Sequence, residues 1–96
     1  MLTTEVITLT LQRHDKAMPI GIDLTRSADG RWILLADLKK ESPLARYRHL
    51  RPGAKLVRFA INGKAPHERP SILQAVALLR DAEGELTLTF YGRTRQ

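Results

Sequence analysis

The sequence has no cysteine, few aromatic residues (two Phe, two Tyr and one Trp) and no long hydrophobic run. Without cysteine, neither a disulfide framework nor a thiolate metal site can form. No apolar stretch approaches the ~20 residues that a membrane-spanning helix requires, and no secretory leader is visible at the N-terminus. We therefore expect a cytoplasmic protein that associates with membranes, if at all, through its partners.

What the chain does contain is the composition of an ordinary globular domain. Its 96 residues are 43% hydrophobic and 27% charged, which is enough chain to bury a core without disulfides or metal. No internal repeat or low-complexity segment interrupts it. We expect one domain over residues 1–96, with its core at about 5–93, either complete in itself or cut from a longer protein.

The charge is strongly basic. Lys and Arg number 16 and Asp and Glu number 10, giving +6 at pH 7, so nucleic acid and acidic lipid headgroups come into question as partners. The basic residues are scattered, however, and the aromatic residues do not interleave with them as in a base-stacking platform. This pattern disfavours a specific nucleic-acid role and leaves acidic lipid headgroups open.

Alternation of apolar and polar residues predicts that most of the chain is β. The clearest case is 5–13, in which every second residue from Ile7 is aliphatic. Turn signals separate such runs, among them the segment 27–30 and the pair Asn62-Gly63. The expected strands cover 5–13, about 20–26, 31–38, 54–61 and 85–91.

Two segments predict helices. Ser42 is placed to cap, and Pro43 to begin, a short helix near 43–49. From Pro70 or Ser71 to about residue 81, apolar residues recur with the period of an amphipathic helix. The predicted fold class is therefore mainly β with two helices (α+β), built as a partly open antiparallel barrel or sandwich of about five to six strands.

The chain is organised around 19–24, a Pro-x-Gly turn that runs into a short alternating strand. Ile20, Ile22 and Leu24 fall on one face of that strand. Gly21 has no Cβ, so another backbone or a small anion can come close to it. The consecutive amides of residues 20–22 are able to converge as a nest for a carboxylate.

Three motifs in order resemble the PDZ family, and the resemblance covers nearly the whole chain. Pro19-Ile20-Gly21-Ile22 stands where the family has its carboxylate-binding Gly-Leu-Gly-Phe loop. Ser42–Arg46 together with Leu50–Leu56 resembles the family's Ser-Pro-Ala and Leu-x-x-Gly-Asp segment. Ala60–Gly63 resembles the family's Val-Asn-Gly turn, and Ser71–Leu79 resembles the groove helix that follows it.

The resemblance implies a non-catalytic interaction module, as in scaffold proteins, that binds the C-terminal tail of a partner protein. The tail would add as an antiparallel strand between the second strand and the long helix. Its carboxylate would sit on the loop of Pro19, Ile20, Gly21 and Ile22. The other residues that the resemblance assigns to the ligand are Asp23, Leu24, Thr25, Ile72, Val76 and Leu79, with Arg13 or Lys16 as a basic aid to the carboxylate.

Ile72 predicts part of the ligand's sequence. It matches the first groove-facing helix position, where a His in this family selects Ser or Thr two residues before the ligand's end. Isoleucine accepts no hydrogen bond, and burying an unpaired hydroxyl against it costs about 1–3 kcal/mol. We therefore expect a hydrophobic-x-hydrophobic C-terminus. Asp23, on the outward phase of the strand, is expected to favour Lys, Arg, Ser or Thr one or three residues from that end.

Two positions depart from the family's pattern. Pro19 replaces the first glycine and has no amide to donate. The amides that donate in the family correspond to the next three residues, so the site need not be lost. Ala54 stands where an Asp is usual, which concerns a local turn and not the groove.

No constellation points to catalysis, a metal or a cofactor. His14, His49 and His67 lie apart, without the spacing of metal ligands. The serines sit at turn or capping positions, which explains them without a nucleophile. We expect no enzyme activity, no cofactor and no small-molecule substrate.

Two other functions stay open beside C-terminal peptide binding. One is a basic anion-binding domain for acidic phospholipid headgroups or nucleic-acid backbone, whose binding would fall steeply with salt. The other is a PDZ domain that binds an internal segment or regulates a larger protein.

Overall fold

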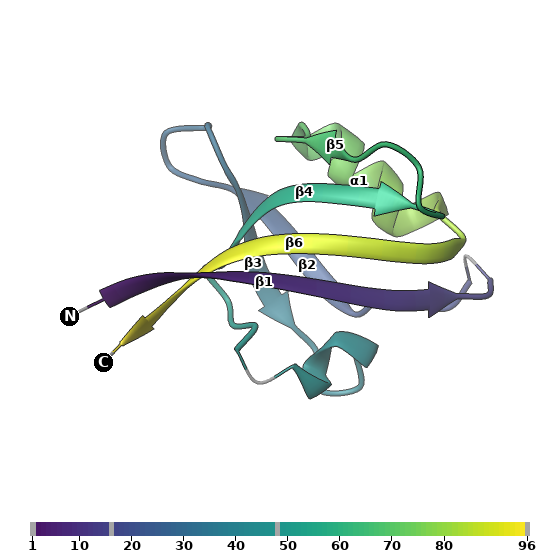
Figure 1. Cartoon of the computed structure of the whole chain (residues 1–96), viewed down its shortest axis with the longest axis horizontal. Coiled ribbons are helices and arrows are strands. Elements are labelled where there is room, and N and C mark those ends of the chain that lie inside the picture. The colour runs from purple at the N-terminus through teal and green to yellow at the C-terminus, as the bar shows by residue number, and fades with distance from the viewer. Residues whose placement is uncertain (1, 16, 48, 96) are drawn as a thin grey trace.

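The computed structural model describes residues 2–15, 17–47 and 49–95, and the side chains within 5–92 of these ranges. It is a six-stranded antiparallel sheet in the order β1-β6-β4-β3-β2, with β5 paired to β4 off this path (Figure 1). The strands are β1 (Leu2–Arg13), β2 (Ile22–Arg26), β3 (Ile33–Leu38), β4 (Lys55–Ile61), β5 (His67–Glu68) and β6 (Gly84–Arg95).

The fold is thus mainly β, and the five predicted strands are all present. Their turns follow from local chemistry: Asn62 and Gly63 have φ of 53° and 70°, the left-handed pair that a tight hairpin turn requires. Lys64 N–H donates to the carbonyl of Ile61 at 3.0 Å and closes that turn. The two-residue strand β5 lies in a polar stretch that carries no alternation, so the sequence does not predict it.

The expectation of two helices is wrong, since the described residues contain a single α-helix, α1 (Ile72–Asp81). It begins at Ser71 with a capping box, in which Ser71 and Gln74 bond each other's backbone N–H. The segment predicted as a helix near 43–49 is a short 3₁₀ turn, η1 (Pro43–Arg46). Four residues are too few to repay helix nucleation, and Tyr47 is already extended at φ −88° and ψ 101°. Residue 48 lies outside the described residues.

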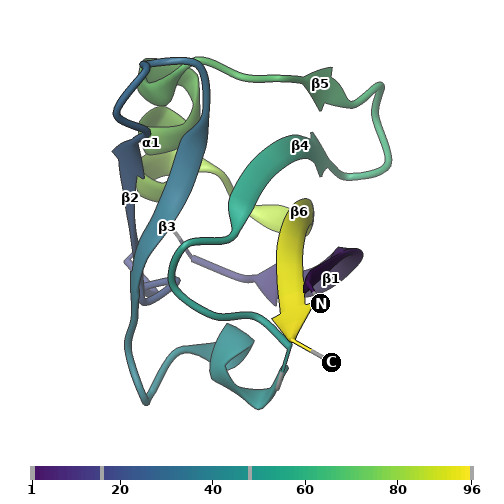
Figure 2. The same cartoon turned by 90° about the vertical axis from the view of Figure 1, so that its left-hand side faces the viewer.

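The core lies inside the bend of the sheet. Figure 2 shows β2 and β3 on one side and β1 and β6 on the other, with α1 closing one end. Six side chains are buried almost completely: Leu9, Leu35, Leu44, Leu86, Leu88 and Phe90. Along β1 and β6 all twelve residues pair, from Leu2 with Arg95 to Arg13 with Gly84. The two ends of the chain consequently lie together (Figure 1).

Two features of this fold position the candidate site. Strand β2 is at an edge of the sheet, paired only with β3. Helix α1 packs against β2.

In the described part of the chain, no helix is long and apolar enough to cross a lipid bilayer.

Candidate ligand-binding groove

The outer edge of β2 offers unpaired backbone groups. At one end the Gly21 carbonyl accepts from Lys39 N–H at 2.9 Å, and at the other Ser27 N–H donates to the Trp32 carbonyl at 2.9 Å. Backbone groups alternate in direction along a strand, so the odd-numbered residues between these ends face β3. The N–H and C=O groups of Ile22, Leu24 and Arg26 therefore face the open side, where another strand can pair.

Helix α1 supplies an apolar wall beside this edge. Ala75 and Leu78 point into the core, with 0% and 4% of their surface exposed. Ile72, Val76 and Leu79 follow at positions i, i+4 and i+7, which places them in one stripe. Ile72 and Leu79 pack partly on the core, whereas Val76 between them is 44% exposed. The stripe is thus a half-exposed apolar surface distinct from the core-facing one.

The loop before β2 is held by Ser42. The Ser42 hydroxyl donates to the Ile20 carbonyl at 2.5 Å and accepts from Leu44 N–H at 3.1 Å. Gly21 lies against it with φ +78°, and a Cβ at Gly21 would stand 2.7 Å from Ser42 Cβ. Only glycine fits this position, because a side chain would be both strained and too close.

These contacts fix the direction of two amides. In a trans peptide, a carbonyl and the next N–H point opposite ways. Since the Ile20 carbonyl points to Ser42, the Gly21 N–H points away from it. Since the Gly21 carbonyl points to β3, the Ile22 N–H points to the open edge. Within the described residues, none of the loop hydrogen bonds uses the N–H of Ile20 or Gly21 as its donor. Pro19 is exposed.

Arg13 connects the loop to the helix. Its side chain is 3% exposed. The guanidinium donates to the Met18 carbonyl from Nε at 2.9 Å, and from Nη1 to the carbonyls of Leu79 at 2.5 Å and Ala82 at 3.2 Å. A cation at the C-terminal end of a helix is favourable. The side chain that the sequence suggested as an aid to the carboxylate thus ties the loop before β2 to the C-terminal end of α1. The other candidate, Lys16, lies outside the described residues.

The structure brings the other predicted residues to the same edge but on different faces. Ile20 and Ile22 are 4% and 8% exposed and belong to the core, with Leu24 half-buried beside them. Asp23 and Thr25 are exposed. Asp23 lies directly opposite Asp37 of β3, and like charges so placed are unfavourable.

Sequence reasoning missed the part of Ser42 in the loop. Its identity as a cap was readable from Ser42-Pro43, and the structure confirms it. Its contact with Ile20 spans 22 positions, which no local pattern reveals.

Comparisons with known proteins add no family to this geometry: no family model matches the chain, and no curated protein matches it. The features that bear on function are the open edge of β2, the apolar stripe of α1, and the N–H groups of Gly21 and Ile22, which point away from Ser42 and from β3 respectively.

Proposed function

We propose that the chain is a PDZ-like module that binds the free C-terminus of a partner protein in the groove between β2 and α1. The observation that carries the proposal is the direction of the Gly21 and Ile22 amides, at the start of an unpaired strand edge. Hydrogen bonds from such amides to a carboxylate contribute about 1.5–3 kcal/mol each. The partly open barrel of that family is compatible with the bent sheet and the helix beside its edge.

The ligand adds to β2 as an antiparallel strand. The outward backbone groups of Ile22, Leu24 and Arg26 give affinity that does not depend on the ligand's sequence. The last side chain of the ligand packs on the partly exposed Leu24, Val76 and Leu79, beside the buried Ile20 and Ile22. Only a few side chains of the ligand contact the protein, and the ligand loses conformational entropy when it binds. We therefore expect a micromolar dissociation constant, which corresponds to a binding free energy of about −8 kcal/mol.

Ile72 and the pair of Asp23 and Asp37 set the specificity. Ile72 stands at the start of the stripe and favours an apolar side chain two residues before the ligand's end. Asp23 and Asp37 place two exposed carboxylates opposite each other. A Lys or Arg of the ligand one or three residues from its end relieves their repulsion.

Amidation of the ligand is the direct test. A hydrophobic-x-hydrophobic peptide is compared as free acid and as C-terminal amide by fluorescence anisotropy. The amidated peptide lacks the negative charge that the N–H groups of Gly21 and Ile22 would bind. Its affinity is therefore expected to be about 10- to 100-fold lower, which corresponds to the free energy of one charged hydrogen bond. Equal binding of both forms would overturn the carboxylate site and favour an internal segment.

Substitution of Ile72 by His is expected to move the preference from an apolar residue toward Ser or Thr two residues before the ligand's end. The imidazole supplies the hydrogen-bond partner that isoleucine lacks, so the preference between the two peptides should change by about tenfold. Leu73→His is the matched control, because Leu73 is 77% exposed on the same helix. A preference that stays unchanged in Ile72→His, or that shifts equally in Leu73→His, contradicts the assignment.

A further inference from the structure

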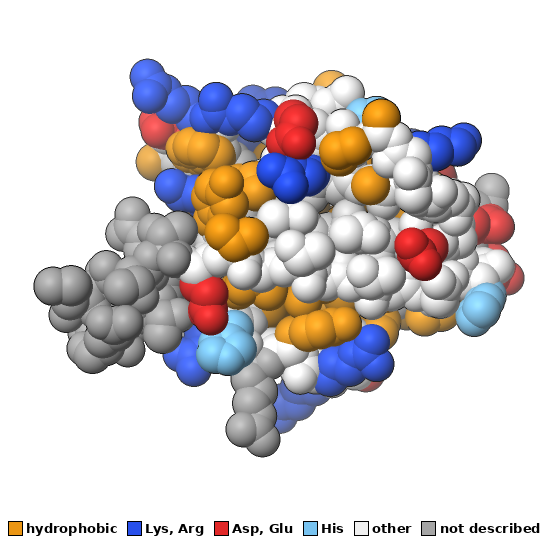
Figure 3. All heavy atoms as spheres, in the orientation of Figure 1, with side chains coloured by type: hydrophobic (Ala, Val, Ile, Leu, Met, Phe, Trp, Pro, Cys, Tyr) orange, Lys and Arg blue, Asp and Glu red, His pale blue; other side chains and the backbone are white. Residues whose placement is uncertain are grey.

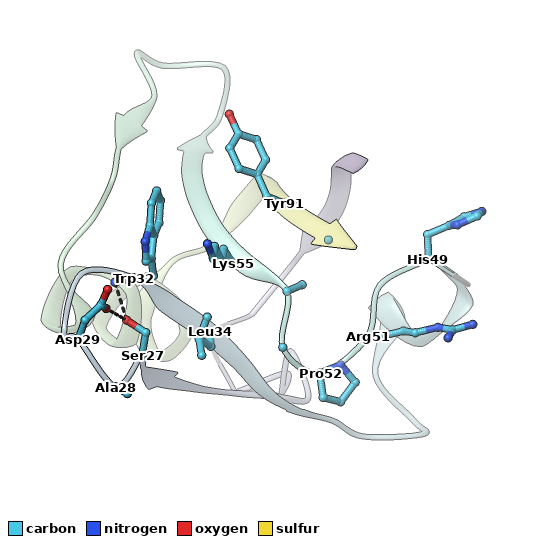
Figure 4. Close-up of a pocket in the computed structure, with 13 residues that line it drawn as sticks. Ser27, Ala28, Asp29, Trp32, Leu34, His49, Arg51, Pro52, Lys55 and Tyr91 are labelled. Carbon is cyan, nitrogen blue, oxygen red and sulfur yellow. Dashed lines mark hydrogen bonds between the residues drawn. The ribbon is translucent and has the colours of Figure 1, made fainter. Parts of the chain in front are cut away.

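A hollow lies on the outer face of the sheet, away from the edge of β2. It is an open cleft of about 1000 Å³ lined by the β2–β3 turn, the segment before β4, and residues of β3, β4 and β6. Figure 4 shows the rings of Trp32 and Tyr91 pointing the same way on either side of Lys55. Figure 3 shows apolar side chains bordered by Lys and Arg on this part of the surface. The cleft thus combines aromatic rings with cations.

The cations at Trp32 lack acidic partners. Lys55 Nζ and the Arg69 guanidinium carbon each stand 4.6 Å from the centre of the Trp32 ring. Among the described residues, no carboxylate forms an ion pair with either cation. Glu68, the neighbour of Arg69, is instead 2.8 Å from Arg58 Nε. Two positive charges therefore converge on one aromatic ring, and neither is held in an ion pair within the described residues.

The acid nearest in this cleft is already engaged. Hydrogen bonds from the Ser27 hydroxyl and from Arg31 N–H hold the pKa of Asp29 below its usual 3.8, with the charge of Lys55 as a lesser cause. Asp29 therefore stays ionised within the turn. Arg51 adds a further cation to the lining, so the cleft has a positive balance.

Arg69 is held in an uncommon backbone conformation. Its φ is +47°, in the left-handed region that is unfavourable for a non-glycine residue. Its N–H is fixed to the Val57 carbonyl at 2.8 Å. A residue keeps a strained backbone conformation only where contacts with the surrounding structure hold it there. Here it accompanies the placement of the guanidinium over Trp32.

Apolar side chains continue the cleft across the sheet. Val6, Tyr91, Lys55 and Leu34 are successive cross-strand partners on β1, β6, β4 and β3. Val6 is 62% exposed and Tyr91 37% exposed. An aliphatic side chain, a Tyr and a Trp among cations are the groups that settle at the boundary between lipid headgroups and acyl chains.

We propose that this face docks on the surface of an anionic phospholipid membrane, with Lys55, Arg69 and Arg51 against lipid phosphates and with Trp32, Tyr91 and Val6 at the headgroup boundary. Charge complementarity favours this occupant over two others. The Trp32 ring is engaged by cations, so it is not a free platform for a nucleic-acid base. A peptide lying on this face would not reach the open edge of β2, so pairing with that strand would not hold it there. The inference does not depend on the groove at β2.

Trp32 is the sole tryptophan, so its fluorescence reports on this surface alone. The full chain is titrated with vesicles of phosphatidylcholine containing phosphatidylserine, and with vesicles of phosphatidylcholine alone. Binding to the anionic vesicles, with a blue shift of the emission and quenching by brominated acyl chains, is the expected result. Binding without a change in Trp32 emission would place the contact elsewhere and overturn the proposal.

Variants separate this face from the general charge of the protein. Lys55→Ala/Arg69→Ala is expected to lower vesicle partitioning about 30-fold, or about fivefold for each basic residue removed. Lys40→Ala/Lys64→Ala is the matched control, because both residues are exposed and neither lines the cleft. Val6→Glu, at an exposed position, gives a second readout that spares the folded core. Equal losses in the two double variants, or unchanged partitioning in Val6→Glu, contradict the proposal. Displacement of the vesicles by a single-stranded oligoribonucleotide at equal phosphate concentration would assign the surface to nucleic acid instead.

Discussion

Replacement of Gly21 by Ala is expected to lower the free energy of unfolding by about 2–4 kcal/mol and to weaken C-terminal peptide binding by at least about tenfold. The φ of +78° strains any other residue, and the new Cβ would press on Ser42 Cβ at 2.7 Å. Relief of that contact turns the Ile20–Gly21 peptide, and with it the amide proposed to receive the carboxylate. Denaturant unfolding measures the change in stability. Fluorescence anisotropy of a labelled peptide, under conditions where both proteins are folded, measures the change in binding.

Gly30→Ala is the matched control for this change. Gly30 has a similar φ of +72°, but a Cβ there meets nothing within 4 Å. The two variants share backbone strain and differ in the contact with Ser42. Gly21→Ala/Ser42→Gly should therefore be less destabilised than the sum of its single changes, since the second change removes the crowded atom. A loss in Gly30→Ala as large as that in Gly21→Ala, for both stability and binding, would contradict this account.

Substitution of Arg13 by Met is expected to lower the free energy of unfolding by about 3 kcal/mol, because buried carbonyls lose a charged donor. The three carbonyls belong to Met18, Leu79 and Ala82, so the loop and the end of α1 lose their common anchor. Peptide affinity should fall with stability, since both walls of the groove are affected. Thermal unfolding and calorimetric peptide titration check the two.

Arg13→Lys distinguishes a tether from a charge. Lysine keeps the cation but not the planar fork that bonds several carbonyls at once. If Arg13 acts by positioning the groove, the Lys variant loses most of the stability and affinity that the Met variant loses. Full affinity with Lys would show that the charge alone matters. Arg80→Met serves as the control, because Arg80 is exposed and pairs only with its neighbour Asp81 among the described residues. Its unfolding midpoint should change little.

The parts of the fold that local chemistry specifies were predictable. Alternation identifies β1 and β6, Asn62-Gly63 identifies its turn, and Ser71 with Gln74 identifies the start of α1. The number of helices was not predictable, because a Ser-Pro start is common to 3₁₀ and α turns and the next residues decide between them. Likewise β5 owes its strand to pairing with β4, which residues 67–68 do not encode.

The sequence indicates which residues of β2 and α1 lie at the candidate site, but not which contacts hold the site together. Periodicity placed the stripe of Ile72, Val76 and Leu79 on one side of the helix, and the alternation of 20–24 placed the apolar residues of the strand. The roles of Ser42 and Arg13 depend on contacts between distant segments, which the residue types alone do not specify. The cleft at Trp32 likewise unites residues from three strands and two loops.

The continuous pairing of β1 with β6 has a mechanical consequence. Leu2 lies opposite Arg95, so a force applied through the two ends of the chain loads that pair first. Hydrogen bonds between antiparallel strands lie perpendicular to the strands, so this pull opens them one after another like a zipper instead of shearing them together. Resistance to such a pull is therefore low, and the ribbon peels before the core, the groove or α1 bears any load.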